Sequence, residues 1–319
     1  MSVSVIIPCF NAAKYINHCL DSLAAQDYKD FDVIIVDDCS TDNTIDVINA
    51  YRKNSRLNIQ LLENDINSGP SYSRYKAIVS SDAEFVCFCD SDDWLDSDFL
   101  KLMVEEQEKA NYDVVFCSLR LAFNSGKKIE LLQTFSHLDL IDANKTLVVA
   151  PYSLCLLLSR RELFLDIPHP DTRYGEDMAL IPIIIGRAKS FSAVNKCLYN
   201  YYCREDSASN KPTMKMIDSL EQSFLFVHEH LSPNFYFQKE FLGTRNYLYG
   251  ALINLFKFSF DTKKANSILN KFEGMYPEWS SNIYLNTLSL PKRILLYCAK
   301  HRMWIIIKVI SGIHTLLVR

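Results

Sequence analysis

Short apolar runs alternate with amphipathic stretches along the N-terminal part of the chain. The apolar runs cover 3–9 (VSVIIPC), 32–38 (DVIIVDD), 58–64 (NIQLLEN), 83–90 (AEFVCFCD) and 112–118 (YDVVFCS). The helix-like stretches between them lie near 12–26, 42–53, 70–80 and 96–110. Near-continuous apolar strands that alternate with helices are typical of βαβ units, whose helices cover both faces of a parallel sheet. The pattern therefore predicts an α/β fold with a mainly parallel sheet.

The pattern changes farther along the chain. Two short strands at 154–159 and 197–203 flank a helix near 176–188. From about residue 213 onward the apolar spacing is helical throughout. A polar stretch that contains a proline, EDSASNKPT, lies around residue 210 and indicates a domain boundary. We therefore expect an α/β domain over 1–210 and a helical C-terminal region over 211–319.

Composition places the chain among ordinary folded proteins. Hydrophobic residues make up 49% of the 319 residues, which is enough for a packed core and excludes a mainly disordered chain. The net charge of −4 excludes a general electrostatic attraction to nucleic acid, so we expect no nucleic-acid partner. The charge is unevenly spread, because residues 291–319 contain six Lys and Arg residues and no Asp or Glu.

Cysteine usage bears on the cellular compartment. The chain has ten cysteines, no CxxC pair, and most of the cysteines lie inside apolar runs. This pattern favours buried thiols in a reducing compartment over disulfides or a zinc site. The N-terminal MSVSVIIPCF lacks the basic region of a secretory signal. We therefore expect a cytoplasmic protein.

Two aspartates end the second predicted strand, in the segment VDDCSTDNT (36–44). The carboxyl ends of strands form the ligand crevice of open α/β sheets, and a carboxylate such as Asp38 can accept hydrogen bonds from a ribose or a base there. The same polar run also predicts capping of the next helix. The capping candidates are Ser40, Thr41 and Asp42. Both interpretations can hold together.

A second acidic run follows the fourth predicted strand. Its members are Asp90, Asp92, Asp93, Asp96 and Asp98. Asp96 and Asp98 are placed to cap the next helix. Asp90 and Asp92 are like charges at a strand end, which a divalent cation would stabilise. Mg²⁺ and Mn²⁺ take one or two carboxylates and complete their shell with phosphate oxygens and water, so the run predicts a metal–diphosphate site or, alternatively, a solvated acidic turn.

A third acidic pair, Glu176 and Asp177, leads the apolar helical run RYGEDMALIPIII (173–185). Carboxylates at a helix N-terminus complement the helix dipole, which explains the pair without any function. The functional alternative makes one of the two a general base.

Taken in order, these segments resemble the family 2 glycosyltransferases, which have the GT-A fold and include many enzymes of bacterial surface polysaccharides. The matching segments are VSVIIPCFN for the family's VSVIIPxYN, VDDCSTDNT for VDDGSxDxT, NSGPSYSRY for NxGxxxARN, DSDD for the metal-binding DxD, and Glu176-Asp177 for the ED motif. The resemblance covers about 1–210. Cys39 stands where the family has glycine, and Ser73 and Tyr75 replace the alanine and asparagine beside Arg74.

The resemblance implies an inverting transfer of a sugar from a UDP-sugar to a hydroxyl of a glycan or a lipid-linked saccharide. The residues expected to hold the nucleotide part of the donor are Pro8, Phe10, Asn11, Asp38, Gly69, Arg74, Asp90 and Ser91. Asp92, together with Asp90, is expected to ligate a Mn²⁺ or Mg²⁺ cofactor that bridges the diphosphate. Asp177 is expected to take the proton from the acceptor hydroxyl.

A weaker similarity joins YNYYCREDSAS (199–209) to a tyrosine-rich strand of the family that leads to Arg and Ser. It implies that Tyr202, Arg204 and Ser207 contact the donor diphosphate. An ordinary aromatic strand and polar turn would explain the segment equally well.

The C-terminal segment 289–318 combines basic residues with Trp304 and many aliphatic side chains. Lys308 interrupts its last apolar stretch, which is shorter than the ~20 residues of a membrane span. A basic apolar helix can lie in the interface of an anionic membrane, on the inner face of the cytoplasmic membrane here. The same helix can instead pack on the rest of the chain or in a homo-oligomer.

Other function classes have recognisable motifs. A sugar nucleotidylyltransferase resembles LxxGxGTRxxP near its N-terminus, and a dinucleotide dehydrogenase carries GxGxxG after its first strand; the chain has neither. A transferase-like protein that binds a glycan or a partner without turnover is a further alternative. The presence of Asp90, Asp92 and Asp177 argues against it.

Overall fold

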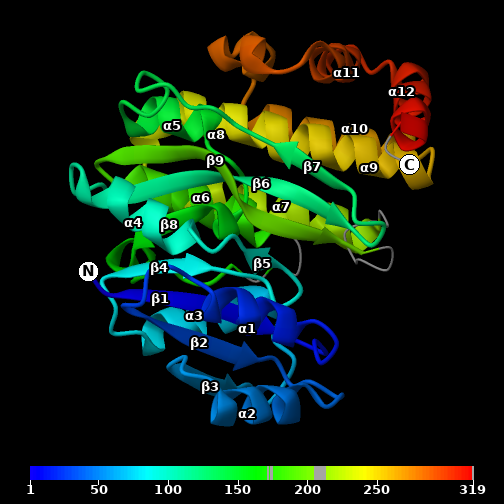
Figure 1. Cartoon of the computed structure of the whole chain (residues 1–319). Helices are drawn as coiled ribbons and strands as arrows, with labels where there is room; N and C mark the ends of the chain where they lie inside the picture. The colour runs from blue at the N-terminus through cyan, green and yellow to red at the C-terminus, as the bar shows by residue number, and fades with distance from the viewer. Residues whose placement is uncertain (171, 173–174, 205–212, 318–319) are drawn as a thin grey trace. The chain divides into compact units, whose positions relative to one another are not determined.

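The computed structural model describes residues 1–170, 172, 175–204 and 213–317 (Figure 1). Two compact units make up the chain. The first comprises Met1–Asp171 with Arg187–Ser207, and the second comprises Thr172–Gly186 with Ala208–Arg319. The predicted boundary near residue 210 lies outside the described residues, so the predicted domain limits stay predictions.

A nine-stranded sheet forms the centre of the first unit. Its strands are β1 (Val3–Cys9), β2 (Phe31–Asp37), β3 (Ile59–Glu63), β4 (Phe85–Phe88), β5 (Trp94–Leu95), β6 (Val114–Phe123), β7 (Lys128–Leu131), β8 (Leu157–Arg160) and β9 (Phe191–Cys203). The order is β3-β2-β1-β4-β8-β6-β9-β5, with β7 paired to β6. The four strands from β3 to β4 are parallel, whereas β8 is antiparallel to both of its neighbours. The α/β prediction is confirmed, and the sheet as a whole is mixed.

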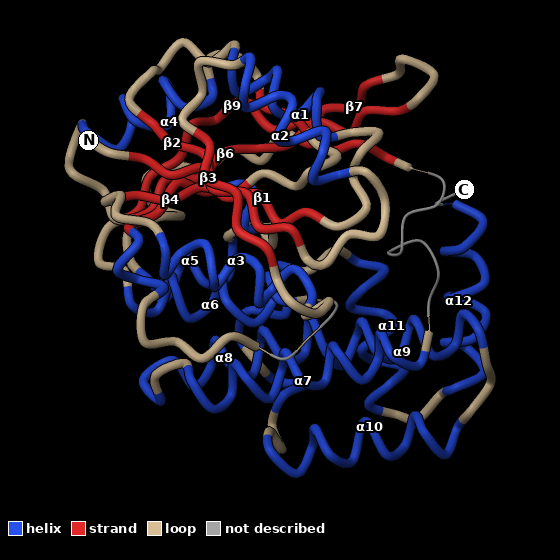
Figure 2. Tube along the Cα trace, turned by 90° about the horizontal axis from the view of Figure 1, so that it is seen from below, coloured by secondary structure: helices blue, strands red, loops and turns tan. Residues whose placement is uncertain are grey.

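Helices cover both faces of this sheet. They are α1 (Ile16–Ala24), α2 (Thr44–Asn54), α3 (Gly69–Ser80), α4 (Phe99–Glu108) and α5 (Ala143–Val149). Figure 2 shows α1, α2 and α4 on one face of the sheet and α3 and α5 on the other. The central strands β1 and β4 are buried along their whole length, because apolar side chains from both faces enter the core. Eight of the ten cysteines are buried and all ten are free thiols, as their apolar surroundings predict.

The second unit is helical, as predicted for the C-terminal region. Its helices are α6 (Glu176–Arg187), α7 (Met214–His230), α8 (Tyr236–Leu242), the π-helix Gly243–Leu248, α9 (Tyr249–Phe258), α10 (Thr262–Met275), α11 (Leu290–Lys300) and α12 (Trp304–Leu317). Aromatic side chains form its core, where the rings of Phe224 and Tyr247 stack with centroids 4.9 Å apart. Among the described residues, no helix has the length and apolarity needed to cross a membrane.

Candidate active site

The strand directions bring four strand ends to one edge of the sheet. β1 is parallel to β2 and β4; β4 is antiparallel to β8, β8 is antiparallel to β6, and β6 is parallel to β9. The carboxyl ends of β1, β2, β4 and β9 therefore face the same way, toward the edge where open α/β sheets bind ligands. The polar motifs found in the sequence lie at or just after these ends, at 10–11, 38–44, 90–93 and 202–204.

Asn11 joins the ends of β1 and β2. Its side-chain oxygen accepts a hydrogen bond from the backbone N–H of Thr41 at 2.8 Å, and its own N–H donates to Ser40 Oγ at 2.9 Å. Ser40 in turn donates from its backbone nitrogen and its hydroxyl to the buried Asp37 carboxylate, at 2.8 and 2.5 Å. Asn11 thus fixes the loop beside the predicted nucleotide site.

Phe10, the residue after β1, has an exposed aromatic ring at this edge. Pro8 is buried in β1, whereas 48% of the Phe10 surface is exposed. An exposed aromatic ring is a surface on which a nucleobase can stack.

The capping interpretation of the run after β2 holds for one of its three residues. Asp42 Oδ1 accepts a hydrogen bond from the backbone N–H of Thr44, the first residue of α2, at 3.0 Å. Ser40 and Thr41 bond to the ends of β1 and β2 instead, so Asp42 is the member of the three candidates that bonds to the helix.

Asp38 is buried at the end of β2 and fastens the loop before α3. Its Oδ1 accepts hydrogen bonds from Asn64 Nδ2 and from the Ser68 backbone N–H, both at 2.8 Å, and its Oδ2 accepts from the Gly69 N–H at 2.7 Å. A carboxylate has about four acceptor positions. Asp38 therefore shapes the predicted nucleotide site and keeps capacity for a further donor.

Three residues of this edge have a left-handed backbone. The φ angles are +86° at Gly69, +63° at Cys39 and +49° at Asn11. Glycine adopts this region without cost and asparagine tolerates it, whereas other residues are strained by about 1–2 kcal/mol. Cys39, which replaces the glycine of the resembling motif, thus keeps the glycine conformation despite its side chain.

Each of the two aspartates expected to hold a metal lies against an arginine. Asp90 Oδ1 is 2.5 Å from Arg74 Nη2, and Asp92 Oδ2 is 2.8 Å from Arg204 Nε. The Arg74 side chain is 5% exposed, so α3 presents a buried guanidinium to the acidic loop. The two positive charges offset the repulsion between the neighbouring carboxylates.

The donor set of the acidic loop fits a divalent cation bound together with a diphosphate. Asp90 and Asp92 offer hard carboxylate oxygens, and their side chains are 37% and 20% exposed, within reach of a ligand. Among the described residues, no three His, Cys, Asp or Glu side chains are grouped to hold a metal by themselves. A cation here would therefore take further ligands from phosphate oxygens and water.

Asp93 is a buried member of the acidic loop for which the sequence assigned no role. Its Oδ1 accepts a hydrogen bond from the Tyr202 backbone N–H at 2.7 Å, and its Oδ2 accepts from the Tyr199 hydroxyl at 2.5 Å. Burial, and then the charges of Asp90 and Asp92, raise the pKa of the Asp93 carboxyl well above its usual value. Asp93 thereby ties the acidic loop to the end of β9.

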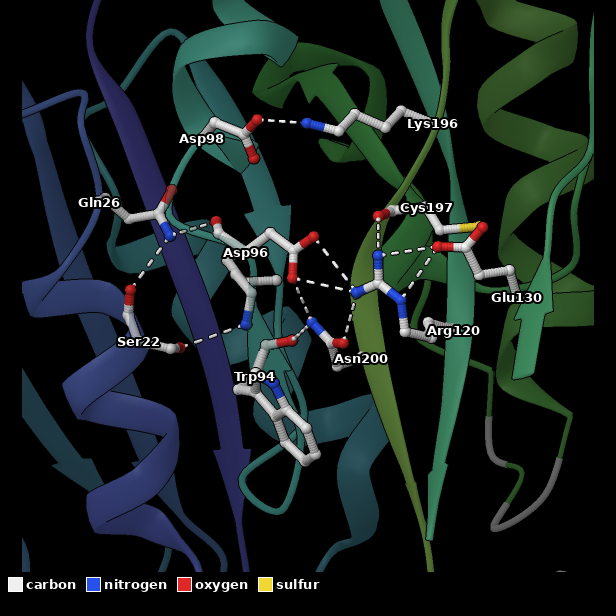
Figure 3. Close-up of polar contacts among 11 residues, drawn as sticks. Ser22, Gln26, Trp94, Asp96, Asp98, Arg120, Glu130, Lys196, Cys197 and Asn200 are labelled. Carbon is white, nitrogen blue, oxygen red and sulfur yellow. Dashed lines mark hydrogen bonds and ion pairs between the residues drawn. The ribbon is translucent and has the colours of Figure 1, made fainter. Parts of the chain in front are cut away.

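Asp96 and Asp98 do not cap α4, contrary to the sequence prediction. Arg120 on β6 donates from Nη1 to both Asp96 carboxylate oxygens, at 3.2 and 3.3 Å, and Asn200 Nδ2 donates to Asp96 Oδ1 at 2.8 Å (Figure 3). Asp98 occupies the N-cap position without a side-chain capping bond and pairs with Lys196. Arg120 on β6, and Asn200 and Lys196 on β9, bind these carboxylates in place of the backbone N–H groups of α4. The result is a network that anchors β5, directly after the acidic loop.

The remaining predicted site residues fall in three places. Ser91 is partly buried in the acidic loop, beside Asp90 and Asp92. Glu176 and Asp177 form the first turn of α6, which belongs to the second unit. Ser207 lies outside the described residues.

The fold and the edge motifs define the class of protein. A model of the glycosyl transferase family 2 matches residues 4–167, just over half of the chain. The chain therefore belongs to this family, and the GT-A fold expected from its motifs is confirmed.

The chain is also similar to individual glycosyltransferases and to a solved structure. The chain is 38% identical over 122 residues to the poly(ribitol-phosphate) beta-N-acetylglucosaminyltransferase TarS of Staphylococcus aureus, across 38% of this chain and 21% of TarS. It is 30% identical over 211 residues to the putative teichuronic acid biosynthesis glycosyltransferase TuaG of Bacillus subtilis, across 65% of this chain and 81% of TuaG. The crystal structure of S. aureus TarS 1–349 in complex with UDP matches with a TM-score of 0.70 at 22% identity, across 98% of this chain and 90% of that one. The chain spans about a fifth of the whole length of TarS.

Proposed function

We propose that the protein is an inverting glycosyltransferase that moves a hexose or N-acetylhexosamine from a UDP-sugar to a hydroxyl of a bacterial wall or surface polymer. The observation that carries the proposal is the acidic loop of a family 2 chain, in which Asp90 and Asp92 lie against arginines at the carboxyl edge of the sheet. The polymer class rests on TarS, whose name describes a poly(ribitol-phosphate) acceptor, and the UDP donor rests on the TarS crystal structures with UDP and UDP-GlcNAc.

The nucleotide is proposed to bind between the ends of β1 and β2. Phe10 offers its exposed ring to the base, and Asp38, already rigid through its hydrogen bonds to the loop before α3, accepts a further bond from the base or the ribose. Because Asp38 is fixed before the ligand arrives, little of its conformational entropy is lost on binding.

Asp90 and Asp92 are the residues that would hold a Mn²⁺ or Mg²⁺ ion at the donor diphosphate. Such an ion acts as a Lewis acid that offsets the negative charge developing on the departing UDP. Arg204, which pairs with Asp92, carries a guanidinium whose planar fork suits a bidentate contact with phosphate oxygens.

Asp177 is proposed as the general base. A carboxylate in the first turn of α6 can accept the proton of the acceptor hydroxyl while that oxygen attacks the anomeric carbon. A single displacement from the face opposite UDP inverts the anomeric configuration. Glu176, its neighbour, is assigned a structural role at the helix N-terminus.

Calorimetric titration with UDP tests the nucleotide site. We expect UDP to bind the wild-type chain, and Mn²⁺ to strengthen that binding, whereas uridine should bind without regard to Mn²⁺ because it lacks the diphosphate. A chain that binds no UDP with or without Mn²⁺ would contradict the proposal.

Peripheral membrane contact is part of the proposal, because α11 and α12 expose an apolar face. On α11, Leu290 and Tyr297 are 65% and 63% exposed, and on α12, Ile305 is 72% exposed. Basic residues accompany these side chains and acidic ones are absent from 291–319, so an anionic lipid surface complements the segment. This contact would keep the enzyme on the cytoplasmic face of the membrane, near a lipid-linked acceptor.

Vesicle flotation tests this contact. We expect the chain to float with phosphatidylglycerol vesicles and not with pure phosphatidylcholine, and Ile305→Glu to lower flotation several-fold. Ile66→Glu serves as the matched control, since Ile66 is 71% exposed in the first unit. Equal flotation of the Ile305 and Ile66 variants would refute the contact, and a loss of dimers in the Ile305 variant would assign the face to a homo-oligomer.

A further inference from the structure

Arg204 is held from two sides at the end of β9. Its guanidinium carbon lies 5.2 Å from the centroid of the Tyr15 ring, in a cation–π contact, and its Nε lies 2.8 Å from Asp92. Tyr15 comes from the loop before α1, and neither the sequence motifs nor the comparisons assign it a role. An aromatic face and a carboxylate therefore both contact this guanidinium.

The Tyr15 ring is itself supported by a row of aromatic side chains. The Tyr202 ring lies 6.0 Å from it, and the Trp94 ring lies 6.3 Å from Tyr202, centroid to centroid. His18 packs edge-on against Trp94 at 4.6 Å. The backbone N–H of Tyr15 donates to the Ala12 carbonyl at 2.8 Å. The ring is thus fixed through both its main chain and its neighbours.

The backbone that carries Arg204 is fixed as well. Asp93 accepts a hydrogen bond from the Tyr202 N–H, two residues before Arg204, and Asp93 belongs to the same acidic loop as Asp92. The main chain of β9 and the side chain of Arg204 are therefore both tied to the acidic loop. The ring of Tyr15 adds a contact to the guanidinium itself.

The orientation of the guanidinium plane matters for phosphate recognition. All N–H donors of a guanidinium lie in its plane, and contact with an aromatic ring restricts the orientations that this plane can take. Bidentate contacts with phosphate oxygens are made in that plane. Without the ring, the flexible side chain would have to be ordered when the diphosphate binds, and the affinity for the diphosphate would fall.

We propose that Tyr15 is a positioning residue for recognition of the donor diphosphate, acting by holding the Arg204 guanidinium beside Asp92. This inference rests on the proposed function, because it takes the donor to be a nucleoside diphosphate sugar bound at the acidic loop. The part of Tyr15 that acts is its aromatic face, and its hydroxyl is dispensable.

The test compares UDP with uridine in wild type, Tyr15→Leu and Tyr15→Phe, by calorimetry in the presence of Mn²⁺. We expect Tyr15→Leu to weaken UDP binding about tenfold, the size of a partly desolvated cation–π contact, and to leave uridine binding within about twofold. Tyr15→Phe should bind both ligands as wild type does. In an Arg204→Leu background, Tyr15→Leu should weaken UDP binding by less than about twofold, since the two residues act as one unit.

The outcomes separate this inference from the proposed function. Normal UDP binding by Tyr15→Leu overturns the inference while leaving the proposed function intact. An equal loss of UDP and uridine binding also overturns it, because it shows that Tyr15 supports the nucleoside pocket or the fold. The inference is also wrong if Tyr15→Phe weakens UDP binding as much as Tyr15→Leu does. A wild-type chain that binds uridine and not UDP overturns both the inference and the proposed function.

Discussion

Asp177→Asn should lower the rate of sugar transfer about 10²- to 10⁴-fold, the range in which general bases contribute to enzymatic rates. Asparagine has nearly the same shape as aspartate, so the first turn of α6 should form as before. The asparagine amide, however, cannot accept the proton of the acceptor hydroxyl. The UDP dissociation constant should stay within about twofold of the wild-type value, because a general base for the acceptor does not hold the donor. Initial rates of UDP release, with calorimetry of UDP binding alongside, measure both quantities.

Glu176→Gln is the matched control for this prediction. Glu176 lies in the same turn of α6, next to Asp177, and the substitution removes the same charge from the helix N-terminus. It should leave the transfer rate within about threefold of wild type, since loss of one charge at a helix N-terminus costs about 0.3–1 kcal/mol of helix stability and no proton transfer. If Asp177→Asn transfers sugar at the wild-type rate, Asp177 is not the base. If Glu176→Gln loses activity instead, the base is Glu176.

The second large effect is expected from Asp92→Asn. Loss of this carboxylate removes a hard oxygen ligand and the charge partner of Arg204. Transfer should fall about 10²- to 10³-fold, in line with the several kcal/mol that a Lewis acid supplies to a developing anion. Mn²⁺ should then no longer strengthen UDP binding, which calorimetry with and without the ion reports directly.

Asp98→Asn is the control for Asp92→Asn. Asp98 lies in the same acidic run but pairs with Lys196, whereas Arg74 and Arg204 pair with Asp90 and Asp92. Its variant should keep the full response of UDP binding to Mn²⁺. An undiminished response in Asp92→Asn, or an equal loss in both variants, would show that the acidic loop does not hold the ion at Asp92.

The alternation of apolar runs made much of the first unit predictable. The run 3–9 coincides with β1, and the second, third and fourth runs contain β2, β3 and β4 to within a few residues. Because parallel strands share one carboxyl edge, the sequence alone could also place the ends of β1, β2 and β4 together. The short edge strand β7 was missed, since its four residues are mostly exposed and carry little apolar signal.

The partners of the site residues could not be read from local sequence. Arg204 is more than a hundred residues from Asp92, and Asn200 is 104 residues from Asp96, so no local spacing signals these pairs. The capping prediction for Asp96 is wrong for a similar reason, because the competing donors Arg120 and Asn200 lie on other strands, 24 and 104 residues away. Asp93 looked like its acidic neighbours in the sequence, and only the fold shows that it is buried against β9.

The most direct test of the glycosyltransferase account is to follow turnover by proton NMR. Wild-type chain would be incubated with Mn²⁺, poly(ribitol phosphate) and UDP-α-N-acetylglucosamine or UDP-α-glucose, while UDP and the anomeric signals of the product are monitored. The account predicts that UDP appears in step with a β-linked sugar on the polymer, at a rate that Asp177→Asn lowers at least about 10²-fold. An α-linked product, or UDP release no faster than that of Asp177→Asn with both donors, would contradict it.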